Sequence, residues 1–478
     1  MKKLVSILLA FVMIAALFVP AFATDEKAES YEGDPVVIVR GIDFAGLIHE
    51  DGSKALKFNL VDVLTLLYDF GVGAVRKEDK AFENALISYC QKLFAPISSD
   101  NEGKSVYADV HMKTYPYSAA EIDDLDEWLD GEAGLVHTAA DSFGADNVYF
   151  FTYDWRKSPL ALSDELNDFV EMVKKNTGKT KVDIGACSMG GMVTTAYMYE
   201  YGTDSIDTLV YFSAAHNGTD IAGAALTGDI YTSGDFLLNY LSDMAGDSWL
   251  LKVLLKAVDI AGIFDGVATF LNNFIEKNKE MVYDELMRDY LGTSLGFWGM
   301  CCDKDFDASV EFVFGDCKDK YPVVVEELSK IRDFVFSTEK VIDKAYENGV
   351  KVSIVSHYNS MLLPIYDETV VQSDSVIESY LTSHGGTFAD FGETLSDEYV
   401  SKIEAKYISP DKVVDASTCA YKDTTWIVKD APHVGGLYGS ELSDFSMWLL
   451  SRDTQPTVYT DNDYPRFTAV DEELNFIR

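Results

Sequence analysis

The 478-residue chain is short of cysteine and of basic residues. Six cysteines are too few for the disulfide framework of a small secreted scaffold. The 39 lysines and arginines stand against 79 aspartates and glutamates, which gives a formal net charge of −40. Such a field repels nucleic acid and anionic bilayers, so we expect no nucleic-acid partner and favour a neutral substrate. Acidity alone names no function, because a solvated acidic surface also explains it.

The sequence also lacks a second long apolar run. The first 23 residues combine Lys2 and Lys3, an apolar stretch over residues 4–19, and the small-residue site Ala21-Phe22-Ala23. This pattern predicts a secretory signal peptide that is cleaved after Ala23, with an uncleaved membrane anchor as the alternative. We therefore expect an exported, secreted protein.

No internal repeat and no metal-ligand spacing is visible, so we expect neither a repeat architecture nor a metal or other cofactor. Export permits disulfides, and Cys301, Cys302 and Cys317 lie close enough in sequence to suggest one. Cys187 is expected to be a small buried thiol. Hydrophobic residues make up 47% of the chain and aromatic residues 13%, which excludes a disordered chain.

Apolar strand-like runs alternate with helical patterns over residues 36–213. Runs such as PVVIVRG and NVYFFTYDWR have apolar residues on both faces, which is typical of a mostly parallel sheet covered by helices. Helical patterns dominate from about residue 220 to 347, and strand patterns return at residues 350–358 and 424–433. The fold class predicted is α/β.

The expected division of the chain follows from this alternation. The segments are a signal peptide (1–23), the first part of an α/β core (24–219), a helical cap insertion (220–347), the second part of the core (348–450) and a surface tail (451–478). Within the insertion, residues 249–274 carry Lys252 and Lys256 one helical turn apart. That amphipathic helix either packs in its own core or forms a lid that touches a lipid surface or an acyl chain.

The stretch KVDIGACSMGGM places Ser188 between a strand and a helical pattern. Ala186-Cys187-Ser188-Met189-Gly190 is an A-x-S-x-G version of the G-x-S-x-G nucleophile elbow. A strand that turns sharply into a helix strains its apex residue, and small residues must flank the apex to avoid collisions. Ser188 is the predicted nucleophile; the alternative is a small-residue turn with a harmless serine.

A serine nucleophile needs a histidine base and an acid, which follow the serine in chain order in this type of turn. Three of the seven histidines precede Ser188. His216 lies too early, His357 precedes every suitable acid loop, and His384 looks like a helix C-terminal histidine. His433, in APHVGG after the last predicted strand, is therefore the predicted base.

The acid should lie in YDETVVQSDS, after the strand at residues 350–355. We favour Asp367, then Asp374, and leave Glu368 open. For the oxyanion hole we predict the backbone N–H of Met189 and that of Ile42, after Gly41, with Asp43 as the alternative to Ile42.

These residues together resemble the α/β-hydrolase fold and, more narrowly, the lecithin:cholesterol acyltransferase family of lipases and acyltransferases. The segment Tyr153-Asp154-Trp155-Arg156 stands where that family carries its Y-D-W-R segment, and DETV and APHVGG fit its acid and histidine loops. The resemblance covers about residues 35–213 and 350–450. It departs at Ala186, which replaces a glycine, at RGID, which replaces His-Gly, and in the unmatched insertion. We expect Asp154 and Arg156 to be a structural ion pair.

The resemblance implies a serine-dependent ester hydrolase, lipase or O-acyltransferase that acts on a neutral ester or lipid through an acyl-enzyme. Two other functions stay open: a catalytically inactive binding protein that reuses the fold, and a secreted serine peptidase. A peptidase would require a basic or proline-selective pocket that the sequence does not display.

Overall fold

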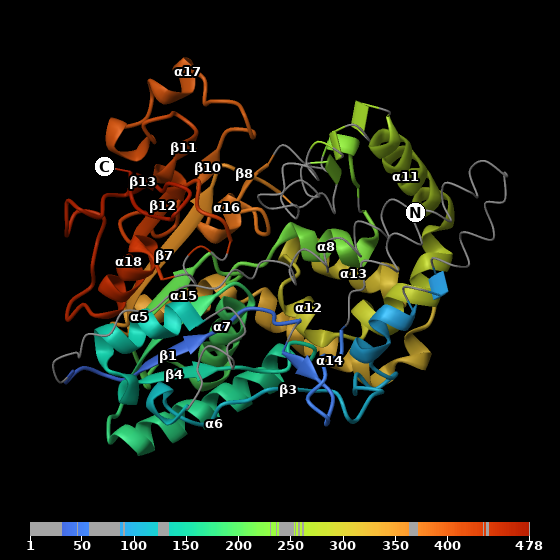
Figure 1. Cartoon of the computed structure of the whole chain (residues 1–478), viewed down its shortest axis with the longest axis horizontal. Helices are drawn as coiled ribbons and strands as arrows, with labels where there is room; N and C mark the ends of the chain where they lie inside the picture. The colour runs from blue at the N-terminus through green and yellow to red at the C-terminus, as the bar shows by residue number, and fades with distance from the viewer. Residues whose placement is uncertain are drawn as a thin grey trace.

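A computed structural model gives the fold of the chain (Figure 1). The residues it describes are 31–44, 46–56, 87–88, 91–122, 133–229, 231–235, 237–238, 253, 255–256, 259–260, 262–362, 371–433, 435 and 439–477. The predicted signal peptide and Asp367 lie outside the described residues.

A seven-stranded sheet, parallel throughout, lies at the centre of the molecule. Its strands are β1 (Val36–Val39), β4 (Val148–Phe151), β5 (Val182–Cys187), β6 (Ile206–Phe212), β7 (Lys351–Tyr358), β12 (Thr425–Lys429) and β13 (Phe467–Ala469). They run in the order β13-β12-β7-β6-β5-β1-β4. The mixed α/β class is confirmed, and the sheet strands β1, β4, β5, β7 and β12 each fall within a run that the sequence predicted.

Both faces of this sheet are buried, as its apolar strands require. One face packs against α5 (Ala133–Phe143) and α18 (Glu441–Leu450). The other packs against α6 (Pro159–Thr177), α7 (Met189–Tyr201) and α15 (Thr338–Glu347). Alternate residues of β1 divide between the two cores, because successive side chains of a strand point to opposite faces.

Most of the helices between α8 and α15 gather to one side of the sheet (Figure 1). They are α8 (Asp220–Thr227), α11 (Ile263–Val282), the π-helical η4 (Tyr283–Gly292), α12 (Leu295–Gly299), α13 (Asp303–Phe314), η5 (Lys318–Lys320) and α14 (Pro322–Val335). Trp298, Phe306 and Phe314 are buried in the same core that covers one face of the sheet. This part of the predicted cap is therefore continuous with the core, whereas much of residues 249–262, including Lys252, lies outside the described residues.

Short elements complete the described chain. They are the strands β2 (Leu47–Ile48), β3 (His111–Met112), β8 (Ser360–Met361), β9 (Gln372–Ser373), β10 (Thr387–Phe388) and β11 (Val414–Asp415), the helices α16 (Ser379–Thr382) and α17 (Asp397–Val400), and the 3-10 turns η1 (Ala95–Ile97), η2 (Ala119–Glu121), η3 (Ala145–Asn147), η6 (Ala405–Tyr407) and η7 (Ala416–Thr418). The short strands pair as β2-β3, β8-β9 and β10-β11.

The expectation of a surface tail at residues 451–478 is wrong, because β13 pairs with β12 and Val458 and Val470 are buried. A three-residue edge strand is too short to show a periodic pattern in the sequence.

The suggested disulfide is also absent from the described chain, where all five cysteines carry free thiols. The thiols of Cys301 and Cys302 lie near different partners: the sulfur of Cys301 is 3.9 Å from the Ser309 hydroxyl, and that of Cys302 is 3.8 Å from the carbonyl of Asn217. The buried thiol expected at Cys187 is confirmed. No helix in the described ranges is both long and apolar enough to span a bilayer.

Candidate active site

The candidate site lies at the carboxyl ends of the parallel strands. Ser188 follows β5, the loop at Gly41 follows β1, and His433 follows β12. Asp374 comes after β7, at the end of β9. Because parallel strands present their carboxyl ends at one edge of the sheet, segments far apart in sequence meet there.

Ser188 is the apex of a sharp turn from β5 into α7. Its backbone has φ 51° and ψ −130°, a conformation that costs a non-glycine residue free energy. The turn is held by its own main chain, since the Ser188 carbonyl accepts hydrogen bonds from the N–H groups of Gly191 (3.0 Å) and Ala215 (2.8 Å). The Ser188 side chain does not cap the helix, which leaves its hydroxyl for other partners.

Glycines allow the close approach around this turn. A Cβ atom at Gly190 would collide with the carbonyl oxygens of Val39 and Arg40. One at Gly191 would stand 2.5 Å from the Cβ of Ala214, and one at Gly41 would stand 2.6 Å from the Cβ of Ser188. The steric argument made from the sequence therefore holds, and it extends to Gly41 on the neighbouring strand end.

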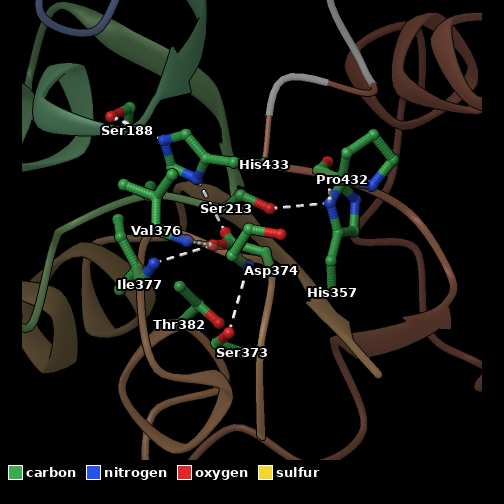
Figure 2. A network of polar contacts seen from close by, with 12 residues as sticks. Ser188, Ser213, His357, Ser373, Asp374, Val376, Ile377, Thr382, Pro432 and His433 are labelled. Carbon is green, nitrogen blue, oxygen red and sulfur yellow. Dashed lines mark hydrogen bonds and ion pairs between the residues drawn. The ribbon is translucent and has the colours of Figure 1, made fainter. Parts of the chain in front are cut away.

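His433 lies between Ser188 and a carboxylate (Figure 2). Its Nε2 is 2.9 Å from Ser188 Oγ, and its Nδ1 is 2.7 Å from Asp374 Oδ2. A carboxylate only accepts, so Nδ1–H donates to Asp374 and Nε2 carries the lone pair that accepts the Ser188 hydroxyl. The imidazole is therefore held in the tautomer that a general base needs.

The carboxylate beside His433 is that of Asp374, one of the acids that the sequence offered. Asp374, the second choice, occupies the one Nδ1–H of His433, whereas the preferred Asp367 lies outside the described residues. Asp374 also accepts N–H hydrogen bonds from Val376 (2.9 Å) and Ile377 (2.7 Å) at Oδ1. An aspartate that bonds the amides two and three residues ahead forms an Asx-type turn. The sequence signal for Asp374 was this turn, S-D-S before an apolar pair.

Burial and hydrogen bonding act on Asp374 in opposite directions. Full burial would raise the pKa of the carboxyl, but His433 and the amides of Ile377 and Val376 lower it, and the pKa lies below its ordinary value. Asp374 is thus ionised at neutral pH and able to stabilise an imidazolium on His433.

The loop after β1 approaches Ser188 from the other side. Ile42 follows Gly41, which lies against Ser188, and Met189 is the first residue of α7. The first N–H groups of a helix have no acceptor within the helix, so the Met189 N–H points outward at the positive end of the helix dipole. Neither amide forms a hydrogen bond within the described part of the chain.

The Y-D-W-R segment holds this loop in place. Tyr153 Oη donates to the Arg40 carbonyl (2.8 Å), and Trp155 Nε1 donates to the Asp43 carbonyl (3.2 Å). The two carbonyls that accept these bonds lie on either side of Gly41 and Ile42 in the sequence. Arg40 itself is 6% exposed and pairs with the Asp43 carboxylate at 2.5 Å.

The ion pair expected of Asp154 and Arg156 is confirmed as structural. Arg156 makes two bonds to the Asp154 carboxylate, at 2.8 Å and 2.7 Å. It also donates to the carbonyls of Pro96 (3.0 Å) and Val110 (3.2 Å), so the guanidinium ties distant loops together.

We expect Tyr153→Phe to lower kcat about 10-fold with little change in KM. Loss of a donor in an oxyanion hole costs roughly 10²–10³ in rate, and a loop that is only loosened should cost less. Tyr346→Phe is the matched control, because Tyr346 Oη also donates to a backbone carbonyl, that of Val352 (3.2 Å), away from the site. Equal ester kinetics in the two variants would contradict the bracing role.

His216 and His384 are not arranged to act as a general base. His216 stacks between Tyr211 (ring centroids 4.4 Å apart) and His384 (5.5 Å). Burial lowers the pKa of His216 well below its ordinary value and that of His384 to about 4, so both rings are neutral. In the described ranges, no group of three or more histidine, cysteine, aspartate or glutamate side chains is placed to hold a metal ion.

Comparisons with known proteins add little to this geometry. No family model matches the chain, and no curated protein matches it. Among solved structures, the chain is similar to one in the crystal structure of the Tle4-Tli4 complex, with 10% identity, a TM-score of 0.31, and coverage of 70% of this chain and 77% of that one. A TM-score this low carries no argument about function.

Proposed function

We propose that the chain is a serine-dependent ester hydrolase or O-acyltransferase of the α/β-hydrolase fold. The observation that carries the proposal is the continuous path from Asp374 through His433 to Ser188, with contacts of 2.7 Å and 2.9 Å. A resting serine hydroxyl is a poor nucleophile, and this arrangement supplies the base and the carboxylate that activate it.

In the first half of the reaction, Ser188 Oγ attacks the carbonyl carbon of the ester while its proton passes to His433 Nε2. The carbonyl oxygen becomes an oxyanion, which the N–H groups of Met189 and Ile42 bind. The tetrahedral intermediate then expels the alcohol, which takes the proton back from His433. An acyl group remains on Ser188.

In the second half, water or an alcohol attacks the carbonyl carbon of the acyl-enzyme while its proton passes to His433 Nε2. The second tetrahedral intermediate then breaks the bond to Ser188 Oγ, which takes the proton back from His433, and the acid or the new ester is released. Water gives a hydrolase and an alcohol gives an acyltransferase. Throughout, the ionised Asp374 stabilises the charged form of His433 without taking its proton.

We infer the substrate class from the charge of the protein and from the resemblance carried by the Y-D-W-R segment. A net charge of −40 disfavours anionic substrates, so we infer a neutral ester or lipid. We also propose membership in the lecithin:cholesterol acyltransferase family, with which the hydrogen bonds of Tyr153 and Trp155 to the loop after β1 are consistent. Export through the signal at residues 1–23, and lipid-surface contact through the cap, belong to the same proposal.

Two measurements on the purified protein test this function. A fluorophosphonate probe should label the wild-type chain at Ser188, because the probe reacts only with an activated serine. A series of p-nitrophenyl esters of increasing chain length, with and without an added alcohol, should then show turnover and reveal the preferred acyl group and acceptor. A chain that is neither labelled nor active on any ester would be a binding protein, and the proposal would be wrong.

A further inference from the structure

A second histidine, His357, lies close to the candidate triad, beside Ser213 and Pro432 (Figure 2). It is the seventh residue of β7 and only 2% exposed. Its Nδ1 is 3.0 Å from the carbonyl oxygen of Pro432 and 2.9 Å from Ser213 Oγ. Pro432 immediately precedes His433, so the ring contacts the main chain that carries the candidate base.

The contact with Pro432 determines the tautomer of His357. A carbonyl oxygen only accepts, so Nδ1 must carry the hydrogen and donate it. Ser213 Oγ is then a second acceptor of the same N–H. The ring is also neutral: burial lowers the pKa of His357 to about 4, although Asp374 and the Pro432 carbonyl act to raise it. A neutral donor is therefore present at Nδ1 at any ordinary pH.

The Ser213 side of the contact leads to the nucleophile. Ser213 directly follows β6 with φ 42°, a left-handed conformation, and its N–H donates to the Val355 carbonyl (2.9 Å). Two residues on, the Ala215 N–H donates to the carbonyl of Ser188 (2.8 Å). Through Ser213, His357 thus contacts the same turn that holds the Ser188 backbone.

The Pro432 side leads to the base. The loop after β12 is attached to β7 twice. The Asp430 N–H donates to the Tyr358 carbonyl (3.0 Å), and two residues further along the loop the Pro432 carbonyl accepts the His357 Nδ1–H. Pro432 and His433 are consecutive and share a peptide bond. The orientation of the Pro432–His433 peptide therefore sets where the imidazole lies relative to Ser188 Oγ.

We propose that His357 is a positioning residue for the reaction: its single Nδ1–H connects the loop of His433 to the turn of Ser188 and fixes the distance between base and nucleophile. It touches neither the substrate nor the reacting atoms. This inference rests on the proposed function, because a distance between base and nucleophile matters only if Ser188 is activated.

His357→Asn and His357→Gln form the matched pair that tests this role. Both introduce a carboxamide, but the Asn amide nitrogen falls close to the place of Nδ1, whereas the Gln nitrogen reaches toward the place of Nε2. The Asn variant should keep most of kcat. The Gln variant should lose roughly 10–100-fold in kcat, since a misplacement of about 1 Å costs on the order of 10² in rate. KM should stay unchanged in both.

A control separates positioning from stability. His384→Asn also removes a buried neutral imidazole, at a residue with φ 56° that asparagine tolerates. Within the described residues, His384 has no hydrogen bond or ring contact with Pro432 or Ser213. The substitution should lower the melting temperature and leave kcat at the wild-type value. If His357→Gln does not fold, Ser213→Ala replaces it, with a smaller loss of kcat expected because only one acceptor is removed.

The rate of labelling by the fluorophosphonate probe distinguishes the two possible failures. Wild type that is not labelled contradicts the proposed function itself. Wild type that is labelled, with His357→Gln labelled just as fast and turning over ester just as well, leaves that function standing and overturns the role of His357. Losses in the Asn and Gln variants that are equal and follow their melting temperatures would also overturn it.

Discussion

Ser188→Ala is expected to abolish ester turnover, with kcat lower by roughly 10⁴- to 10⁶-fold, the range seen when a triad nucleophile is removed. The hydroxyl is the group that forms the acyl-enzyme, and His433 cannot replace it. The substitution removes one oxygen, and that oxygen does not cap α7. Thermal unfolding should therefore stay close to that of wild type. Steady-state hydrolysis of a p-nitrophenyl ester and a melting curve measure both effects.

Ser353→Ala is the matched control for that variant. Ser353 is a buried serine in β7 whose hydroxyl has no hydrogen-bond partner in the described structure. It should retain full activity and full probe labelling. Full residual activity in Ser188→Ala would show that another residue is the nucleophile, and the assignment of the candidate active site would be wrong.

Asp374→Asn is expected to lower kcat by about 10⁴-fold, as loss of the orienting carboxylate does in other triads. The Asn carbonyl can still accept the N–H groups of Val376 and Ile377, so the turn is preserved. Its amide then faces His433 with a donor, which opposes the Nδ1–H and favours the wrong tautomer of the ring. The same ester assay measures the loss.

Asp367→Asn separates the two acids that the sequence offered. Because His433 Nδ1–H is already paired with Asp374, the Asp367 variant should keep kcat within a few-fold of wild type. The reverse result, with activity lost at Asp367 and kept at Asp374, would restore the first choice and contradict the geometry of this site.

Ser188 and the α/β class were predictable because their signals are local. An apex serine needs small neighbours within a few residues, and Gly190 and Gly191 are adjacent to it in the sequence. Buried parallel strands need apolar residues on both faces, and this also shows in the sequence. His433 was predicted as the base by elimination, because chain order and strand ends excluded the other six histidines.

The choice of acid was harder because three carboxylates lie within eight residues of one another. DETV favoured Asp367, and S-D-S before an apolar pair does not by itself mark a catalytic acid. What distinguishes Asp374 is the turn that aims its Oδ2 at a histidine 59 residues away. Similarly, β13 was missed because it is a short edge strand.

The sequence by itself determined the α/β class, the sharp turn and the identity of the hydroxyl, since each depends on residues close along the chain, and chain order then left His433 as the imidazole. Only the tertiary structure decided which carboxylate completes the site, that Tyr153 and Trp155 brace the loop beside Ser188, and that His357 connects that turn to the loop of His433. The physical reason is that these are contacts between segments brought to one edge of a parallel sheet. Hydrogen bonds between residues that are far apart along the chain produce no periodic pattern in the sequence.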